Sequence, residues 1–440
     1  MNPMLGWKVR FAGQVRIVLA LSTMFFWLTL PAKSQEQGQR RGQGRDQASV
    51  ALPEGNGKEI VENNCNVCHG LDRITRAGHS PAEWKVVVDM MVSNGAKLTK
   101  EQMPVVAEYL STNFPDRSPK ATVIAGPVEV AIKEWSVPTP GSRPHDPLAA
   151  PDGSIWYTGQ MANVLGRFDP KTQQFREYPL PPKSGPHGLL ADKDGNIWFT
   201  AQSGSYLGKL DPKTGNVTQY KMTDPKARDP HTPIMDNNGT IWFTLQGADM
   251  VGRLIPKTGE VKVVPVPTPR ANPYGMVVSS KNVVYFAEFG SNKLASIDSD
   301  TMEIHEYTLP NPGARPRRVA ITPDDVIWYT DYARGYLGRF DTKTGATKEW
   351  PSPGGDDSQP YGITAVSNIL WYSESGLRPN TVVRFDPKTE KFQTWLIPSG
   401  GGVVRNMVHT PQGNLWLACS GVNGIAFVEI KGTTSTSALR

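Results

Sequence analysis

Cysteine is scarce in this chain, and no apolar run in it is long. The 440 residues hold 3 cysteines, Cys65, Cys68 and Cys419, which is too few for a disulfide-stabilised fold. The apolar stretch at residues 17–30 is shorter than the ~20 residues that a transmembrane helix needs. Lys and Arg are scattered, so the formal charge of +6 does not indicate a nucleic-acid-binding surface.

The first 34 residues have the layout of a secretory signal peptide. Three basic residues precede the apolar stretch, and Ala32-Lys33-Ser34 then places small residues at the two positions that signal peptidase reads. We predict cleavage after Ser34 and a periplasmic or secreted protein with no stable membrane span; an uncleaved anchor is the alternative. Residues 35–50 are mostly polar, which predicts a disordered linker.

The segment Cys65-Asn66-Val67-Cys68-His69 is the motif for covalent attachment of haem c. In that reading the two thiols form thioethers and His69 is an axial iron ligand. A zinc half-site or a thioredoxin-like pair are the alternatives. Zinc would need further ligands, and His79 is the only other Cys or His in residues 51–116. We therefore expect residues 51–116 to form a small all-α cytochrome c domain with one haem, followed by a linker at 117–130.

Two helices are predicted after this motif. Residues 81–94 place Trp84, Val87, Val88 and Met91 on one face, and Thr99 with Gln102 forms a capping box for a last helix. The candidates for the sixth iron ligand are Met90, Met91, Met103 and His79.

The stretch Glu83–Val92, followed by Gly95-Ala96 and Tyr109-Leu110, resembles short bacterial cytochromes c that are often fused to periplasmic oxidoreductases. The resemblance implies Met91 as the sixth ligand. Methionine ligation raises the potential of haem iron, which favours an electron carrier.

From residue 131 onwards one phrase repeats, as in Ile155-Trp156-Tyr157-Thr158. Its second position is aromatic at 156, 198, 242, 285, 328, 371 and 416. Seven copies at a period in the low forties predict an all-β propeller with four strands per blade, here over residues 131–434 before a tail at 435–440. The repeated Trp residues are expected to pack between blades.

The last copy has no fourth strand of its own, whereas Ile132–Pro138 stands as an unmatched strand before the first copy. We predict that this segment completes the last blade, because pairing the two ends of the ring removes exposed sheet edges.

The phrases Pro186-His187-Gly188, Ile197–Thr200, Leu207–Leu210 and Tyr178–Pro181 resemble the streptogramin B (virginiamycin B) lyase family over residues 128–430. The resemblance implies a seven-bladed propeller and a magnesium-dependent carbon–oxygen lyase that opens a cyclic depsipeptide by elimination. It also implies a site made of a His in a blade-opening turn, a Glu-Pro-His one blade later, and a Glu in the exit of the next aromatic strand.

Two alignments of that site are possible. In the first, His187 precedes Asp229-Pro230-His231, and Leu245 occupies the position of the last Glu. In the second, His231 precedes Asn272-Pro273-Tyr274, and Glu288 is the last carboxylate. The catalytic candidates are His231, Asp229 and His187, with His231 as the base that abstracts a proton.

Polar residues also recur at the blade-opening turns, where we expect them to face one mouth of the central channel. These candidates are His145, His187, His231, Tyr274, Arg317, Tyr361 and Arg405, to which the exits of the aromatic strands add Gln160, Gln202, Gln246, Glu288, Asp331 and Glu374. Such a set suits a small-molecule site. The three His could instead bind a transition metal, or the groups could simply satisfy one another.

Three functions remain open at this point. The first is electron transfer between the haem and a periplasmic redox partner or a small-molecule substrate, which would make the chain part of a periplasmic oxidoreductase. The second is a metal-dependent carbon–oxygen lyase, using Mg²⁺ or another divalent ion, with an accessory haem. The third is a module that senses a ligand and reports it through the haem.

Overall fold

The computed structural model describes residues 51–66, 71–75, 77–93 and 95–431. The predicted signal peptide, the linker at 35–50, the residues Cys68 and His69, and the tail at 435–440 lie outside these ranges. Within them, no helix is long and apolar enough to cross a membrane.

Four helices precede the propeller in the described residues: α1 (Lys58–Cys65), α2 (Asp72–Thr75), α3 (Pro81–Ser93) and α4 (Gln102–Asn113). The predicted capping box is present, because the amide of Thr99 donates to Gln102 Oε1 at 3.0 Å and the amide of Gln102 donates to Thr99 Oγ1 at 3.3 Å. Ser80 and Glu83 form a second capping box at the start of α3, which the sequence analysis missed.

The helices share one small apolar core. Trp84 and Val88 of α3 and Tyr109 of α4 are buried in it. The indole of Trp84 donates to the carbonyl of Phe114 at 2.8 Å, and the Tyr109 hydroxyl donates to the carbonyl of Pro53 at 2.6 Å. The two polar groups of these aromatic side chains, the indole N–H and the phenol hydroxyl, thus both have hydrogen-bond partners, as buried polar groups generally do.

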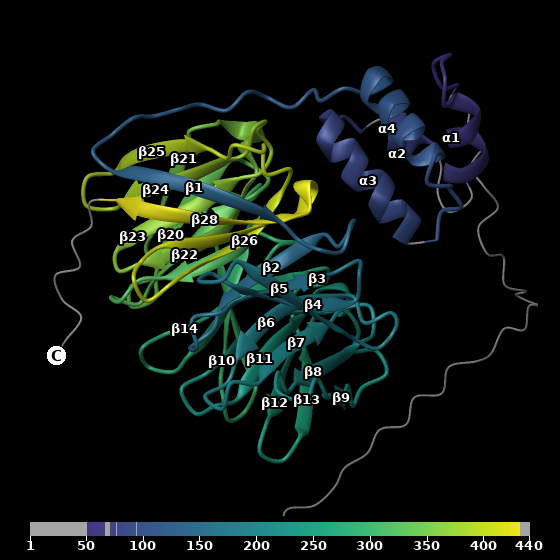
Figure 1. The fold of residues 1–440 in the computed structure, drawn as a ribbon. Helices are drawn as coiled ribbons and strands as arrows, with labels where there is room; N and C mark the ends of the chain where they lie inside the picture. Colours follow the sequence, from purple (N-terminus) through teal and green to yellow (C-terminus); the bar gives the residue numbers. More distant parts are fainter. Residues whose placement is uncertain (1–50, 67–70, 76, 94, 432–440) are drawn as a thin grey trace, which may run out of the picture. The chain divides into compact units, whose positions relative to one another are not determined.

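Residues 129–431 form seven four-stranded antiparallel sheets, which are the blades of the propeller (Figure 1). The strands of blades 1 to 3 are β2 (Pro144–Ala149), β3 (Ile155–Gly159), β4 (Val164–Asp169), β5 (Gln174–Pro179); β6 (Pro186–Ala191), β7 (Ile197–Ala201), β8 (Tyr206–Leu210), β9 (Val217–Lys221); and β10 (Pro230–Met235), β11 (Ile241–Leu245), β12 (Met250–Ile255), β13 (Glu260–Pro265).

Blades 4 to 6 repeat the same order. Their strands are β14 (Pro273–Val278), β15 (Val284–Glu288), β16 (Lys293–Ile297), β17 (Ile304–Thr308); β18 (Pro316–Ile321), β19 (Val326–Asp331), β20 (Tyr336–Asp341), β21 (Thr347–Pro351); and β22 (Pro360–Val366), β23 (Ile369–Glu374), β24 (Thr381–Asp386), β25 (Lys391–Leu396). Short 3₁₀ turns occur at Gln246–Ala248, Asp356–Ser358 and Ser420–Val422.

Blade 7 is built from both ends of the propeller, as the sequence predicts. Its inner strands are β26 (Val404–His409), β27 (Leu415–Cys419) and β28 (Gly424–Lys431), and β1 (Glu129–Ser136) pairs with β28 from Glu129↔Lys431 to Ser136↔Gly424. Figure 1 shows β1 lying along β28. The ring is therefore closed by hydrogen bonds between segments almost 300 positions apart in the printed sequence.

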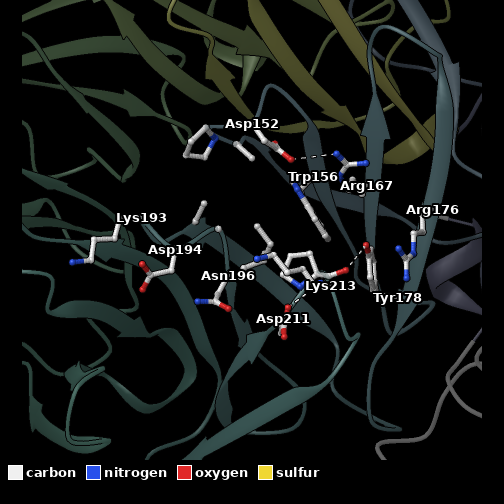
Figure 2. Close-up of a pocket in the computed structure, with 16 residues that line it drawn as sticks. Asp152, Trp156, Arg167, Arg176, Tyr178, Lys193, Asp194, Asn196, Asp211 and Lys213 are labelled. Atoms are coloured by element: carbon white, nitrogen blue, oxygen red, sulfur yellow. Dashed lines mark hydrogen bonds and ion pairs between the residues drawn. The ribbon is translucent and has the colours of Figure 1, made fainter.

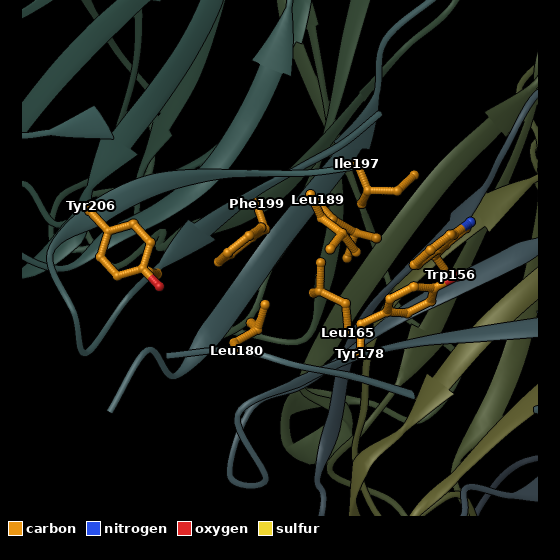
Figure 3. Close-up of a cluster of buried hydrophobic side chains, with 10 residues drawn as sticks. Trp156, Leu165, Tyr178, Leu180, Leu189, Ile197, Phe199 and Tyr206 are labelled. Carbon is orange, nitrogen blue, oxygen red and sulfur yellow. The ribbon is translucent and has the colours of Figure 1, made fainter. Parts of the chain in front are cut away.

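The repeated Trp residues pack between neighbouring blades. Trp156 of blade 1 contacts the cluster that contains Ile197 and Phe199 of blade 2 (Figure 3). Trp416 of blade 7 likewise packs with Ile155 and Tyr157 of blade 1, which closes the circle. The prediction that these indoles form the blade interfaces is confirmed.

In four blades the repeated phrase ends in a Thr that joins the blade to the next one. Thr158 Oγ1 donates to the carbonyl of His187 at 2.8 Å, and Thr200 Oγ1 donates to the carbonyl of His231 at 2.7 Å. Thr244 and Thr330 do the same for Tyr274 and Tyr361. The acceptors are residues of the blade-opening turns, so this hydroxyl fixes the position of the channel side chains.

Candidate functional site

Seven side chains from the blade-opening turns converge at the propeller axis. We call them the channel ring, and they are His145, His187, His231, Tyr274, Arg317, Tyr361 and Arg405, each one residue after the first residue of strands β2, β6, β10, β14, β18, β22 and β26. Five members are buried, whereas Arg317 and Arg405 are half-buried. Solvent therefore reaches the channel ring at its two arginines, whereas the His and Tyr side chains are shielded from it.

The three histidines stack against one another. Ring centroids of His145 and His187 are 3.8 Å apart, those of His187 and His231 are 3.6 Å apart, and His231 lies 4.0 Å from Tyr274. Burial lowers the pKa of all three His well below the usual value, and nearby charged arginines lower it further. The imidazoles are therefore neutral near pH 7.

One ion pair spans the channel. Arg318 Nη2 lies 2.7 Å from Asp146 Oδ1, and the same oxygen lies 2.9 Å from His145 Nδ1. Asp146 and Arg318 occupy the same position of the repeat, in blades 1 and 5. Both are buried, and so each neutralises a charge that burial would otherwise penalise.

Arg317 sits in an aromatic cage. Its guanidinium carbon lies 3.8 Å from the ring centroid of Tyr361, 4.3 Å from that of Tyr332, 4.7 Å from that of Phe289 and 4.9 Å from that of Tyr274. These are cation–π contacts. They orient the guanidinium but leave its charge uncompensated.

Tyr274 and Tyr361 are joined by a hydrogen bond between their hydroxyls. Burial raises the pKa of Tyr274. Burial alone would raise the pKa of Tyr361 too, but Arg317, Arg405 and Arg318 outweigh it and lower that pKa. The two phenols share one hydrogen bond in which Tyr361 is the better acceptor.

The carboxylates at the strand exits lie in a different register from the one we expected. Strand pairing places Glu288, Asp331 and Glu374 opposite Pro273, Pro316 and Pro360. The residues in the equivalent position of blades 1 to 3 are Gly159, Ala201 and Leu245, so Gln160, Gln202 and Gln246 are one residue further on. The expected set of six exits thus mixes two positions of the repeat.

The hydrogen bonds of these carboxylates lead away from the channel ring. Glu374 accepts from the Ser352 hydroxyl at 2.6 Å and from the Thr381 hydroxyl at 2.6 Å. Asp331 accepts from the amide of Arg315 at 3.0 Å and pairs with Arg334 at 3.1 Å. These are contacts with the loops and outer strands, which suit a structural role.

The comparisons with known proteins agree on the propeller. The model of the virginiamycin B lyase family matches residues 121–344 and 291–440. The chain belongs to this family. No curated protein matches it.

Solved structures agree with the family model on the fold. A virginiamycin B lyase from Staphylococcus aureus is 23% identical, with a TM-score of 0.62, over 68% of this chain and 99% of the other. A streptogramin B lyase structure is 24% identical, with a TM-score of 0.63, over 69% and 98%. A hydrazine synthase from Kuenenia stuttgartiensis is 14% identical, with a TM-score of 0.56, over 67% and 97%. At these identities the likeness concerns the fold alone.

Neither alignment of the virginiamycin B lyase site brings two carboxylates together. In the first, Leu245 is buried among apolar side chains, and Asp229 Oδ2 accepts from the amide of Gly247 at 2.7 Å. In the second, Glu288 Oε2 accepts from the Ser291 hydroxyl at 2.7 Å, and burial raises the pKa of Glu288 to about 7. Mg²⁺ prefers ionised oxygen ligands. Glu306, which lies beside Glu288 and raises its pKa further, is already paired with Lys293 at 2.6 Å.

A transition-metal site would have a different composition. One ligand atom each from His145, Asp146 and His187 lie within 4.8 Å of one another. His187 Nδ1 is buried without a hydrogen-bond partner in the described structure. However, Asp146 is already paired with Arg318, and further arginines surround the site. The donor set fits a metal ion, whereas the surrounding charge opposes one.

Apart from the channel, a surface groove is lined by residues of blades 1 and 2 (Figure 2). This groove of about 700 Å³ is lined by Trp156 and by charged residues of both signs, including Arg167, Lys193, Asp194 and Asp211. Arg167 pairs with Asp152 at 3.2 Å. Its charges are close to balanced, so nothing in it selects a ligand as the channel arginines do.

Of the predicted haem-attachment motif, the structure describes Cys65, the last residue of α1, and Asn66. The Cys65 side chain is half-buried, forms no disulfide, and packs against the helical core, as does Met103. Met91 is half-buried on α3. The ring of His79 packs edge-on against Trp84 at 4.7 Å, which accounts for its burial without a metal. A free thiol beside an apolar core and a thioether donor fits a c-type haem.

Three residues of the channel escaped the sequence analysis: Asp146, Arg143 and Thr158. Asp146 stands where other blades have Gly188, Gly275 and Gly362, and an opposite charge in that same position, Arg318, was the available signal. Arg143 precedes the opening turn, and its Nη1 donates to Gln160 Oε1 at 2.9 Å. Only the folded ring shows that Arg143 lies near Arg405.

Proposed function

We propose that this protein is an exported c-type haem protein that transfers electrons and whose propeller binds a redox partner or an oxidisable small molecule. The observation that carries the proposal is the motif Cys65-x-x-Cys68-His69 immediately after the first helix. Its placement behind a secretory signal supports the same reading, because haem c is attached outside the cytoplasm.

The residues that would hold the haem are Cys65 and Cys68 through thioethers and His69 through its imidazole. Met91 is the expected sixth ligand, and Met90 and Met103 are the alternatives. The bound haem would supply one-electron redox chemistry. The chain's own contribution would be the small apolar core around Trp84, Val88 and Tyr109, against which Cys65 packs and which would help to keep water from the haem. That exclusion and methionine ligation both favour a raised potential.

The test is an absorption spectrum of the mature protein, oxidised and then reduced with dithionite. We expect a c-type spectrum that survives acid–acetone extraction, since thioether bonds keep the haem on the chain. Cys65→Ala with Cys68→Ala should abolish it, whereas Cys419→Ala should not, because Cys419 is buried in blade 7. A colourless wild-type protein purified from a host that matures c-type cytochromes would refute the proposal.

Electron transfer is tested separately from haem binding. The reduced protein is mixed with an oxidised small c-type cytochrome, and reoxidation of its haem is followed by stopped flow. We expect transfer that slows as salt screens the encounter. A stably reduced haem that exchanges no electrons with any small cytochrome would leave a haem protein without the proposed role.

A second candidate is the lyase activity, which family membership favours. His231 contacts Tyr274, and Glu288 follows in the next aromatic strand, so one alignment keeps a base and a carboxylate. Incubation with virginiamycin B and Mg²⁺ tests it. Elimination leaves the mass unchanged, so the linear product appears as a shifted chromatographic peak of equal mass. Its formation by the wild type and its loss in His231→Ala would establish the lyase.

A further inference from the structure

The arginines of the channel outnumber the acidic partners that are available to them. Arg318 pairs with Asp146. Among the residues that the structure describes, no carboxylate lies within ion-pair distance of Arg143, Arg317 or Arg405. Even an ionised Tyr361 would neutralise only one of these three charges. The channel ring is therefore a cationic site.

The three unpaired arginines are also the accessible ones. Arg143, Arg317 and Arg405 are half-buried, while the His and Tyr members of the ring and Arg318 are buried. The Nε atoms of Arg317 and Arg405 are buried and have no hydrogen-bond partner in the described structure. The Nε of Arg318 is also without a hydrogen-bond partner, but Arg318 has Asp146 beside it. Unmade hydrogen bonds of charged donors are costly, so an acceptor beside Arg317 and Arg405, which lack a carboxylate partner, would stabilise them.

The surrounding groups fix the guanidinium groups in place. The aromatic cage holds Arg317, and the hydrogen bond to Gln160 holds Arg143. Gln160 in turn donates to Gln202 at 2.7 Å. Burial, and in second place the repulsion from the neighbouring Arg405, lower the pKa of Arg143 to about 10. An anion placed between them would relieve that repulsion.

We propose that the channel ring binds a small oxyanion, a carboxylate or a phosphate, through Arg317, Arg405 and Arg143. Arginine presents several N–H donors in one plane, which matches the paired oxygens of either group. Tyr361, between Arg317 of blade 5 and Arg405 of blade 7, supplies a further hydroxyl. The proposal extends the binding role suggested for the propeller and rests on it, but it does not require the haem.

A cavity of about 340 Å³ adjoins the Arg318–Asp146 ion pair, and none of Arg143, Arg317 and Arg405 lines it. Its walls are mostly apolar, with Met276, Val319 and Ile363 among them, and Asp146 and Arg318 are both among its polar members. The cavity is therefore not part of the proposed anion site, and its lining does not favour a carboxylate over a phosphate.

The test is calorimetric titration of the full-length mature protein with sodium succinate and, separately, with sodium phosphate, at constant ionic strength. We expect saturable one-to-one binding of at least one of the two anions. Arg405→Gln should weaken it roughly tenfold or more, the effect of losing one charge-assisted hydrogen bond. Arg339→Gln is the matched control, because Arg339 lies on β20 and pairs with Asp341.

Two outcomes would overturn the inference: no saturable binding of either anion by the wild type, or equal affinity in Arg405→Gln. Stoichiometric Zn²⁺ binding that His187→Ala abolishes, without anion binding, would assign the channel to a metal instead. If Arg405→Gln does not fold, the inference is tested instead by the thermal unfolding of the wild type with and without each anion. Succinate or phosphate must raise its Tm above that in sodium chloride of equal ionic strength, and an unchanged Tm refutes the site.

The same samples separate this inference from the proposed function. A colourless protein that binds succinate retains the anion site and loses the electron-transfer role. A reducible haem protein that binds neither anion retains the role and loses the site.

Discussion

The helices at residues 58–113 and the blades that follow them bury apolar surface in different ways. Each blade has its own apolar cluster and shares it with the next through an indole, as Trp156 does. The helices have one cluster, centred on Trp84 and Tyr109, with no repeated neighbour to extend it. A domain of this size is marginal on its own. The difference indicates that the propeller is stable by itself, whereas the helices depend on an added apolar group.

The largest expected effect is the loss of the helices without haem. In Cys65→Ala with Cys68→Ala, no thioether can form, so we expect the helical signal in far-UV circular dichroism to vanish while the cooperative unfolding of the propeller persists. Wild-type protein expressed with and without a haem-maturation system is the matched pair. Helices that persist in the haem-free protein would show that the small core suffices.

A smaller effect is expected for an indole between blades. Trp242 is fully buried and packs with Val284 and Phe286 of blade 4, so Trp242→Ala should lower the free energy of unfolding of the propeller by about 3–5 kcal/mol. Urea unfolding followed by fluorescence measures it. Trp135→Ala on β1, where the indole is half-buried, should cost clearly less. The haem spectrum should not change in either variant, and a change would mean that the two regions are energetically coupled.

The smallest effect concerns pH. Burial raises the pKa of Glu288 to about 7, above its value in the unfolded chain. The folded state then holds a proton that the unfolded state has lost, so stability is highest below about pH 4.5 and falls as the pH rises towards 7. Glu288→Gln should remove this slope, worth about 1–3 kcal/mol, in urea unfolding measured across that range. An unchanged slope would place the ionised carboxylate in the folded protein.

The propeller could be read from the sequence because its determinants are local and repeated. The aromatic residue at 156 and its six counterparts fix the blade count, and the unmatched strand before the first blade predicts the closure that β1 and β28 make. The predicted capping box at Thr99 also depends on neighbours only. Such features need no knowledge of distant contacts.

The channel could be read only in part. Counting from the opening turns identified the seven members of the channel ring. At the strand exits, however, the sequence analysis treated Gln160 and Glu288 as equivalent, although strand pairing shows that Gln160 is one residue further along its repeat. Nothing local shows that Arg318 meets Asp146 across the ring, or that the carboxylates are bonded to outer loops. These facts depend on where seven chain segments converge, and they decide the sign of the charge that the site presents.

The pairing of β1 with β28 determines how far the chain can be truncated from its N-terminus before the propeller loses a strand. Removing residues 129–136 would leave blade 7 with three strands and expose the backbone donors and acceptors of β28 along its whole length. Such an edge invites pairing with another chain, so a truncated propeller is expected to aggregate. An expression boundary for the isolated propeller belongs before Glu129, and a protease cut after Ser136 would leave β1 held in blade 7 by its pairing with β28 alone.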